Sequence, residues 1–285
     1  MITVTIDGLA FEAKPTYPSS GWVCRRLQGW YSGAPIRDDA LDRPASDGAF
    51  GVSRAYRSAR PLRFEGALFA ATTEQAIGEL WRAFSAVQAD GRPFPLSVTD
   101  ETGTLTATVS LSGAVEIEPE TDRVARVTAR FIAYDPVKYG PLRQLVTGLP
   151  TAGGGLTYSL FDPAGTLDYG ANGNLGRVEL TNAGTAEVWP TVRVDGGLAG
   201  GFFAQRLDTG QTVRYDRVIP VGSWVEVDFA SGAVVVDGES DGSTYLTRGE
   251  FFSVPPGGAF DVQFNGIGAA TGTPLMTVTI ADGYW

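Results

Sequence analysis

Short runs in which hydrophobic and polar residues alternate make up most of this chain. In one such run Leu62 and Phe64 fall on one face and Arg63 on the other. Period-two alternation is typical of strands with one buried face. Comparable runs lie at 3–6, 22–27, 61–69, 94–98, 105–111, 114–118 and 123–134 in the first half of the chain. The first half therefore predicts a sheet-rich domain.

One segment of the first half has a different period. Residues 72–91 place hydrophobic side chains at spacings of three and four, at Ile77, Leu80, Trp81, Phe84 and Val87. This spacing predicts one amphipathic helix at about 72–90, with Thr72 and Gln75 as a capping box. We expect the hydrophobic stripe to pack across its own sheet, and the alternative is a groove for a partner.

The second half repeats short strands at intervals of about ten residues. The runs lie at 177–182, 188–196, 201–207, 212–218, 224–229, 233–238, 259–266 and 275–281, with Asp-Gly and Asn-Gly turns between several of them. Many short strands with tight turns and no helix predict a jelly-roll-like β-sandwich. The fold class is therefore mainly β throughout.

Charge and glycine content divide the chain into two domains. Residues 1–145 hold 16 Lys and Arg against 17 Asp and Glu, whereas residues 146–285 hold 6 against 15. We predict a first domain at 1–143, a Gly-rich connecting segment at 144–175 that lies against a surface, and a second domain at 176–285.

The absence of histidine excludes the commonest chemistry. Without His, the chain has no Ser-His-Asp triad, no usual metal-ligand set and no general base poised near neutral pH. The single cysteine, Cys24, has no partner for an internal disulfide and is expected to be a buried, small apolar residue. The sequence therefore predicts a protein that is not an enzyme and that holds no cofactor.

Two groups of carboxylates and one short motif are further candidate sites. The groups are Asp38, Asp39 and Asp42, and Asp237, Glu239 and Asp241. The second group resembles a Ca²⁺ loop in composition but lacks the EF-hand spacing, so we expect a solvated turn and no metal. The triplet at 208–210 spells the Asp-Thr-Gly of aspartic proteases, but it has no second copy and stands where a turn is expected.

Trp189 and Trp224 are the candidate binding residues. The alternation of their strands places both on the polar side, Trp224 together with Glu226. Three interpretations remain open: a strand covered on both faces, a contact with another protein, and stacking on a sugar ring.

Charge and hydropathy limit the partners further. The net charge of −10 argues against nucleic acid binding, because phosphate contacts draw on clustered Lys and Arg. No apolar run approaches the roughly 20 residues of a membrane-spanning helix. The N-terminus also lacks the basic start and apolar block of a signal peptide. We expect a soluble protein without membrane insertion, made in a cytoplasm.

Several motifs resemble distal tail proteins of long-tailed phages (siphophages). The segment YDPVKYG closes the first domain at 134–140. A Gly-x-Ala-x-x-x-Pro strand, a Gly-x-x-Val-x-Val-Asp strand and a Phe-x-x-x-Pro-Pro-Gly turn follow, at 184–190, 222–228 and 251–257. The resemblance touches most of the chain at the level of pattern.

The resemblance implies a structural virion protein at the distal end of the tail. It implies a first domain, a β-sandwich or split barrel, that closes into a homo-hexameric ring between the tail tube protein and the tail hub. It also implies a galectin-like or carbohydrate-binding-module-like second domain, with host carbohydrate or a receptor-binding protein as further partners. By analogy with ring-forming tail proteins, the loop at 32–47 is expected to reach a neighbouring subunit.

Two alternative functions remain open from the sequence. One is an independent carbohydrate-binding or host-adhesion module that concentrates its function on Trp189 and Trp224. The other is a different minor tail protein or a tail-tube-like protein, because such proteins share the β-sandwich-plus-helix theme.

Overall fold

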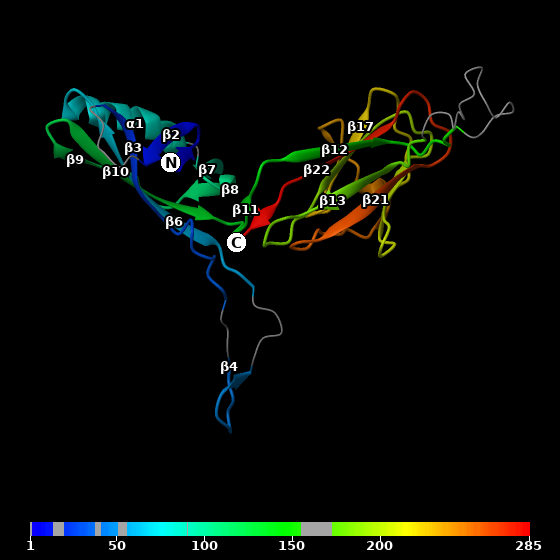
Figure 1. Ribbon diagram of the computed structural model, residues 1–285, viewed down its shortest axis with the longest axis horizontal. Helices are drawn as coiled ribbons and strands as arrows, with labels where there is room; N and C mark the ends of the chain where they lie inside the picture. The colour runs from blue at the N-terminus through cyan, green and yellow to red at the C-terminus, as the bar shows by residue number, and fades with distance from the viewer. Residues whose placement is uncertain (1, 14–19, 38–40, 51–55, 90, 155–172) are drawn as a thin grey trace, which may run out of the picture. The chain divides into compact units, whose positions relative to one another are not determined.

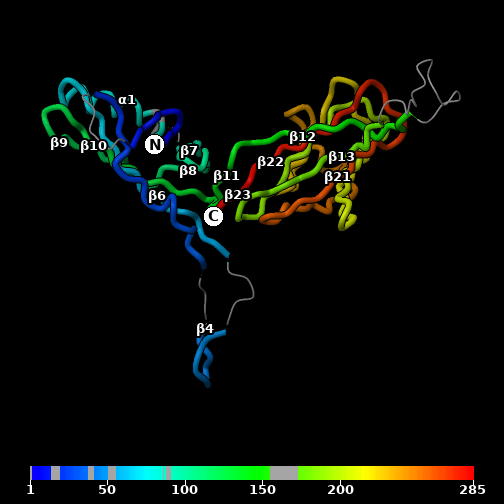
Figure 2. The backbone as a smooth tube through the Cα atoms, in the orientation of Figure 1, coloured from blue at the N-terminus to red at the C-terminus, as the bar shows by residue number. Residues whose placement is uncertain are grey.

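The computed structural model describes residues 2–13, 20–37, 41–50, 56–89, 91–154 and 173–285. The chain divides into two compact units (Figures 1 and 2). Unit 1 comprises Met1–Pro141 together with Tyr284–Trp285, and unit 2 comprises Leu142–Gly283.

Unit 1 is built on a ten-stranded sheet. In spatial order its strands are β23 (Gly283–Tyr284), β11 (Lys138–Tyr139), β8 (Gly103–Leu111), β7 (Phe94–Asp100), β1 (Ile2–Ile6), β2 (Leu9–Ala13), β3 (Gly21–Gln28), β6 (Arg60–Phe69), β10 (Val124–Ala133) and β9 (Glu116–Thr121). A further pairing of β8 with β10 closes the strands from β8 to β10 into a barrel. Because β2 and β3 run parallel and their neighbours antiparallel, the barrel is mixed.

The core of unit 1 lies between the sheet and helix α1 (Thr73–Ala89). Phe11, Phe64 and Phe84 meet there, with ring centroids 4.7 Å apart for Phe11 and Phe64 and 6.2 Å apart for Phe11 and Phe84. Figure 1 shows α1 lying along the same part of the unit as β9 and β10. The predicted helix is confirmed, and its hydrophobic side packs on its own unit.

The hydrophobic stripe of α1 differs from the prediction at one residue. Ala76, Leu80, Phe84 and Val87 are buried, whereas Trp81 is 56% exposed. The next position of a helix is turned by about 100°, so Trp81 leaves the face that Leu80 buries. The small Ala76 takes a place in the core that spacing alone did not assign.

Unit 2 is a sandwich of two antiparallel sheets. The first sheet has the order β12 (Arg143–Gly148), β22 (Leu275–Ile280), β14 (Thr191–Asp195), β17 (Trp224–Asp228), β18 (Val234–Val236) and β19 (Ser240–Asp241). The second has the order β13 (Arg177–Thr181), β21 (Ala259–Gly266), β15 (Phe202–Arg206), β16 (Thr212–Tyr215) and β20 (Leu246–Gly249), and a short 3₁₀ helix, η1, spans Ser243–Tyr245. The mainly β fold class, with a sandwich in the second half, is confirmed.

Alternation sets the core of the sandwich. On β14 and β17, Val192, Val194, Val225 and Val227 are at most 1% exposed, while the residues between them are half-buried. Each inward side chain removes apolar area from water at roughly 25 cal/mol per Å². The core therefore fixes the register, because a slip by one residue would expose the valines.

The predicted connecting segment at 144–175 differs from the structure at its start. Residues 144–148 belong to β12, which pairs along its whole length with β22. Most of β12 is exposed or half-buried, so backbone pairing rather than burial holds it, and the hydrophobic pattern carries no signal. Residues 155–172 lie outside the described residues, as do the predicted contacts of Leu160, Phe161 and Tyr169. The last two residues belong to unit 1 rather than to the second domain.

Candidate functional surfaces

The two candidate tryptophans lie at opposite ends of one strand pair. Trp189 precedes β14 and is 43% exposed, whereas Trp224 begins β17 and is half-buried. The register pairs Asp195 with Trp224, so six residues separate Trp189 from the level of Trp224. At about 3.3 Å per residue this is roughly 20 Å. The two rings therefore do not form one binding surface.

Trp224 already has a stacking partner. The guanidinium of Arg193 lies 4.2 Å from the centre of the ring. Asp195 Oδ1 holds this guanidinium by accepting hydrogen bonds from Nε at 3.2 Å and Nη2 at 2.9 Å. Glu226 lies opposite Arg193 in the register and is half-buried. One face of Trp224 is therefore covered from within its own sheet, and a sugar would have to displace a cation–π contact to stack there.

The acidic turn at 237–241 uses its carboxylates to cap backbone groups. Asp237 Oδ1 accepts a hydrogen bond from the Trp224 backbone N–H at 2.8 Å, and Asp241 Oδ1 accepts one from that of Ser243 at 2.9 Å. Hydrogen bonds from Ser243 lower the pKa of Asp241. Within the described ranges, no group of three His, Cys, Asp or Glu residues could hold a metal ion. Asp38 and Asp39 of the other acidic group are not among the described residues.

The Asp-Thr-Gly triplet forms a surface turn. Asp208 accepts hydrogen bonds from Arg206 Nε at 2.6 Å and from Nη2 at 2.8 Å. Hydrogen bonding from Arg206 is the main reason why the pKa of Asp208 is lowered. Aspartic proteases require two carboxylates that share a proton. Asp208 is instead an ionised partner of an arginine.

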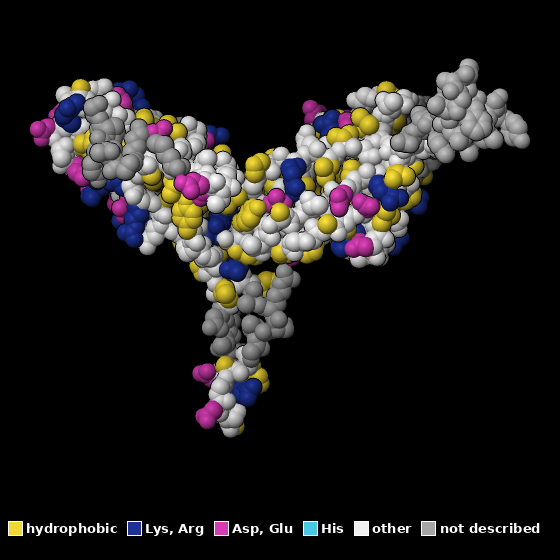
Figure 3. Space-filling model, in the orientation of Figure 1, with side chains coloured by type: hydrophobic (Ala, Val, Ile, Leu, Met, Phe, Trp, Pro, Cys, Tyr) yellow, Lys and Arg dark blue, Asp and Glu magenta, His cyan; other side chains and the backbone are white. Residues whose placement is uncertain are grey.

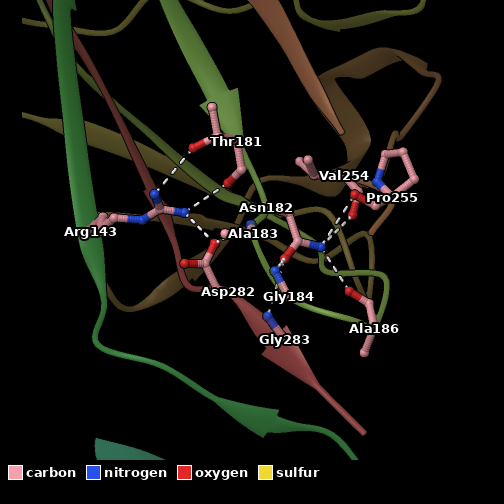
Figure 4. Close-up of polar contacts among 10 residues, drawn as sticks. All are labelled: Arg143, Thr181, Asn182, Ala183, Gly184, Ala186, Val254, Pro255, Asp282 and Gly283. Atoms are coloured by element: carbon pink, nitrogen blue, oxygen red, sulfur yellow. Dashed lines mark hydrogen bonds and ion pairs between the residues drawn. The ribbon is translucent and has the colours of Figure 1, made fainter. Parts of the chain in front are cut away.

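A polar network closes unit 2 at the end where the chain enters and leaves it (Figure 4). Arg143, one residue after the start of the unit, donates from Nη2 to Asp282 Oδ1 and to the Thr181 carbonyl, both at 2.7 Å. Asp282 Oδ1 also accepts a hydrogen bond from the Ala183 backbone N–H at 2.9 Å. The first and last segments of the unit are thus joined by a charged hydrogen bond.

Asn182 is the centre of this network and is 1% exposed. Its Nδ2 donates to the carbonyls of Ala186, Val254 and Pro255, at 2.7, 3.1 and 3.4 Å. Its Oδ1 accepts from the backbone N–H groups of Gly184 and Gly283, at 2.9 and 3.3 Å. The hydrophobic pattern did not predict a role for this residue, although an Asn two residues before a Gly is a signal for a side-chain-capped turn.

The described residues of the predicted loop at 32–47 belong to an antiparallel arm of unit 1 between β3 and β6. At the base Ile36 pairs with Arg57. Arg57 also donates to the Ala34 carbonyl at 3.0 Å and lies 4.4 Å from the centre of the Trp285 ring. Further out, β4 (Leu41–Asp42) pairs with β5 (Ala49–Phe50), and among the described residues the two form a sheet of their own.

The described tip of the arm, residues 42–50, is exposed except for the half-buried Ala49. Phe50 is 57% exposed, and the guanidinium of Arg43 lies 5.7 Å from its ring centre. Acidic, basic and hydrophobic side chains all reach the surface of this hairpin (Figure 3). An isolated two-stranded hairpin is marginally stable in water. The arm therefore has the features of a segment that is stabilised by another surface.

Two cations are buried beside the arm base. Arg60 is 1% exposed and donates to the carbonyls of Pro136, Gly29 and Ser32. Lys138 is 6% exposed and donates to the Trp30 carbonyl at 3.1 Å. Burial, and then the charge of Arg60, lowers the pKa of Lys138 to about 8. Positive charge is thus concentrated inside unit 1.

Cys24 lies in the core of unit 1, as predicted, at 7% exposure. Burial raises the pKa of its thiol to about 11. No helix in the described part of the chain is long and apolar enough to cross a membrane.

Comparison with known proteins gave matches only at the level of structure. No protein family and no curated protein sequence matches this chain. The Dit (gp 19.1) protein of phage SPP1, described as a paradigm of the hub adsorption apparatus in phages that infect Gram-positive bacteria, aligns with a TM-score of 0.63. The alignment covers 100% of both chains at 15% identity.

Chains from the phage P2 baseplate are similar to a lesser degree. In its activated conformation with Ca, the TM-score is 0.57 at 9% identity over 98% of both chains. With Sr, the TM-score is 0.55 at 9% identity, over 98% of this chain and 97% of the other. The chain therefore has, over its whole length, the fold of the phage SPP1 Dit protein and of a phage P2 baseplate chain, which confirms the fold expected of a distal tail protein.

Proposed function

We propose that this chain is a structural, non-enzymatic protein of a phage tail tip, where six copies form a ring that joins the tail tube to the tail hub or baseplate. The observation that carries the proposal is the alignment with SPP1 Dit across the full length of both chains. The protein would be made in the host cytoplasm and would lie in the virion at the distal end of the tail. Its partners would be a tail tube protein and a tail hub protein.

The outer strand β9 of the unit 1 sheet has features that prevent strand pairing with the wrong partner. Strand β9 is an outer strand of the ten-stranded sheet and carries Glu116, Glu118 and Pro119. Charge and proline on an exposed edge prevent indiscriminate strand pairing. A protein that must close into one defined ring needs such protection before it meets its partners.

Unit 2 supports a peripheral role. Most of the net negative charge of the chain lies in its second half, because that half holds few Lys and Arg residues. A net negative charge suits a solvated surface. The exposed Trp189 favours a second candidate function, contact with a host carbohydrate or a receptor-binding protein. Trp189 is the residue to test for it, because Arg193 already covers one face of Trp224.

Negative-stain imaging of the purified full chain tests the proposal. We expect class averages of a ring with six-fold symmetry. Particles with another symmetry, or single subunits at every concentration, would contradict it.

A glycan screen of the full chain tests the second function. We expect the wild-type chain to bind a glycan that the Trp189→Ala variant does not bind.

A further inference from the structure

We propose that a cavity at the foot of the arm receives the acidic arm tip of a second copy of this chain, with Arg63 and Arg130 facing Asp42 and Asp47 of the neighbour. This inference rests on the proposed ring and names the contact that would join its subunits.

The cavity has a volume of about 410 Å³ and lies at the ends of three neighbouring strands. Its lining residues are Gln28, Gly29, Ser32, Pro61, Leu62, Arg63, Ser112, Arg130, Phe131 and Ile132. Arg63 and Arg130 are the charged residues among them. Pro61 is exposed and Ile132 is half-buried, so these two side chains provide the apolar part beside the two guanidiniums, whereas Leu62 and Phe131 are buried in the core.

The two arginines stand directly opposite each other. The register of β6 and β10 pairs Arg63 with Arg130, and both are exposed. In the described part of the chain, Arg63 has one carboxylate partner, Glu65, through Nε at 3.2 Å. Among the described residues, no carboxylate lies within ion-pair distance of Arg130. Like charges opposite each other destabilise a sheet, and an anion between them would offset this cost.

A third arginine, buried behind the cavity wall, adds to the positive potential in the cavity. Arg60 is buried, and two of the carbonyls to which it donates belong to Gly29 and Ser32, which line the cavity. Among the described residues, Arg60 and Lys138 make no ion pair with a carboxylate. A concave surface with cations on its rim and behind its wall focuses positive potential and attracts carboxylates.

The arm tip carries the complementary groups. Asp42 and Asp47 are exposed, and within the described residues neither carboxylate forms an ion pair. Phe50 is 57% exposed on the same hairpin, so its ring can cover the apolar part of the cavity. The one cation of the tip, Arg43, lies against Phe50 of its own hairpin.

A second copy fits the cavity better than the chain's own arm. The cavity includes Gly29 and Ser32, which precede the arm base at Ile36 and Arg57. The tip begins about six residues beyond that base, so a chain filling its own cavity would have to fold its arm back on itself. A head-to-tail exchange between copies generates a closed ring when its rotation closes.

A charge-exchange experiment tests this contact in the full chain. The pocket variant is R63E/R130E and the arm variant is D42R/D47R. Each variant alone brings like charges together at every contact, so we expect its assembly to weaken by about 100-fold or more. An equimolar mixture pairs the acidic arm of one variant with the basic pocket of the other, and basic arms with acidic pockets. The mixture should therefore regain rings in which the two variants alternate.

One variant carries a mass tag, so that native mass spectrometry distinguishes mixed rings from rings that contain a single variant. The double variant E179R/E239R changes the net charge as much as the arm variant does, at two exposed residues of unit 2, and should keep wild-type assembly. Rings formed by either charge variant alone, or a mixture that stays unassembled, would overturn the proposed contact. Neither result would overturn the proposed ring of the wild-type chain. A wild-type chain that never forms rings would overturn the ring itself. Binding of a DNA duplex that R63E/R130E loses, with rings retained, would assign the cavity to phosphate.

Discussion

Asn182 holds together three segments of unit 2 that are distant in sequence. Its amide contacts backbone groups of 184–186, of 254–255 and of Gly283. We predict that Asn182→Ala lowers the free energy of unfolding by about 3 kcal/mol, because several buried backbone groups lose their partner. Urea unfolding of the full chain, followed by tryptophan fluorescence, measures this change. The control Glu239→Ala, at an exposed turn residue, should shift it by less than about 0.5 kcal/mol.

Lys138 makes stability depend on pH in a defined interval. The folded chain releases the Lys138 proton at about pH 8, whereas an unfolded chain keeps it up to about 10.5. The unfolded state therefore binds more protons between these values, so this residue makes the folded state more stable as pH rises. We predict that wild type gains stability relative to Lys138→Met from pH 8 to 10, by at most about 1.4 kcal/mol per pH unit. Cys24 and Tyr139 titrate in both proteins, so their contributions to the pH dependence cancel in the comparison. Parallel profiles of stability against pH for the two proteins would therefore refute the lowered pKa of Lys138.

At the scale of elements, alternation predicted most strands, because burial of one face leaves a direct mark on the sequence. Trp81 was assigned to the buried face because a periodic pattern does not define the width of the stripe. Strand β12 was missed because backbone pairing holds it and its side chains stay largely accessible. The polar network around Asn182 depends on contacts between distant segments, which no local pattern records.

The arm is an element whose role can be tested without disturbing the sheet. Replacing residues 38–55 by Asn-Gly keeps the pairing of Ile36 with Arg57 and closes it with a two-residue turn. We predict that this variant folds with a melting temperature close to that of wild type but forms no rings. Circular dichroism tests the fold, and light scattering tests the assembly. Intact rings without the arm would remove both its proposed role and the arm-tip contact.

At the scale of the whole molecule, the sequence indicated two domains through charge and composition but placed the end of the chain differently. The last two residues, Tyr284 and Trp285, belong to unit 1, and Trp285 lies against Arg57 at the base of the arm. The chain therefore passes twice between the units, and a linear reading of domains does not detect such a return. The resemblance in motifs identified the fold because it extends over both halves.

Native mass spectrometry of the full chain across a dilution series tests whether six copies form one ring. We predict a species of about 180 kDa, six times the 30.1 kDa subunit. A mass of 30.1 kDa at every concentration, or an assembly of another subunit number, would contradict it.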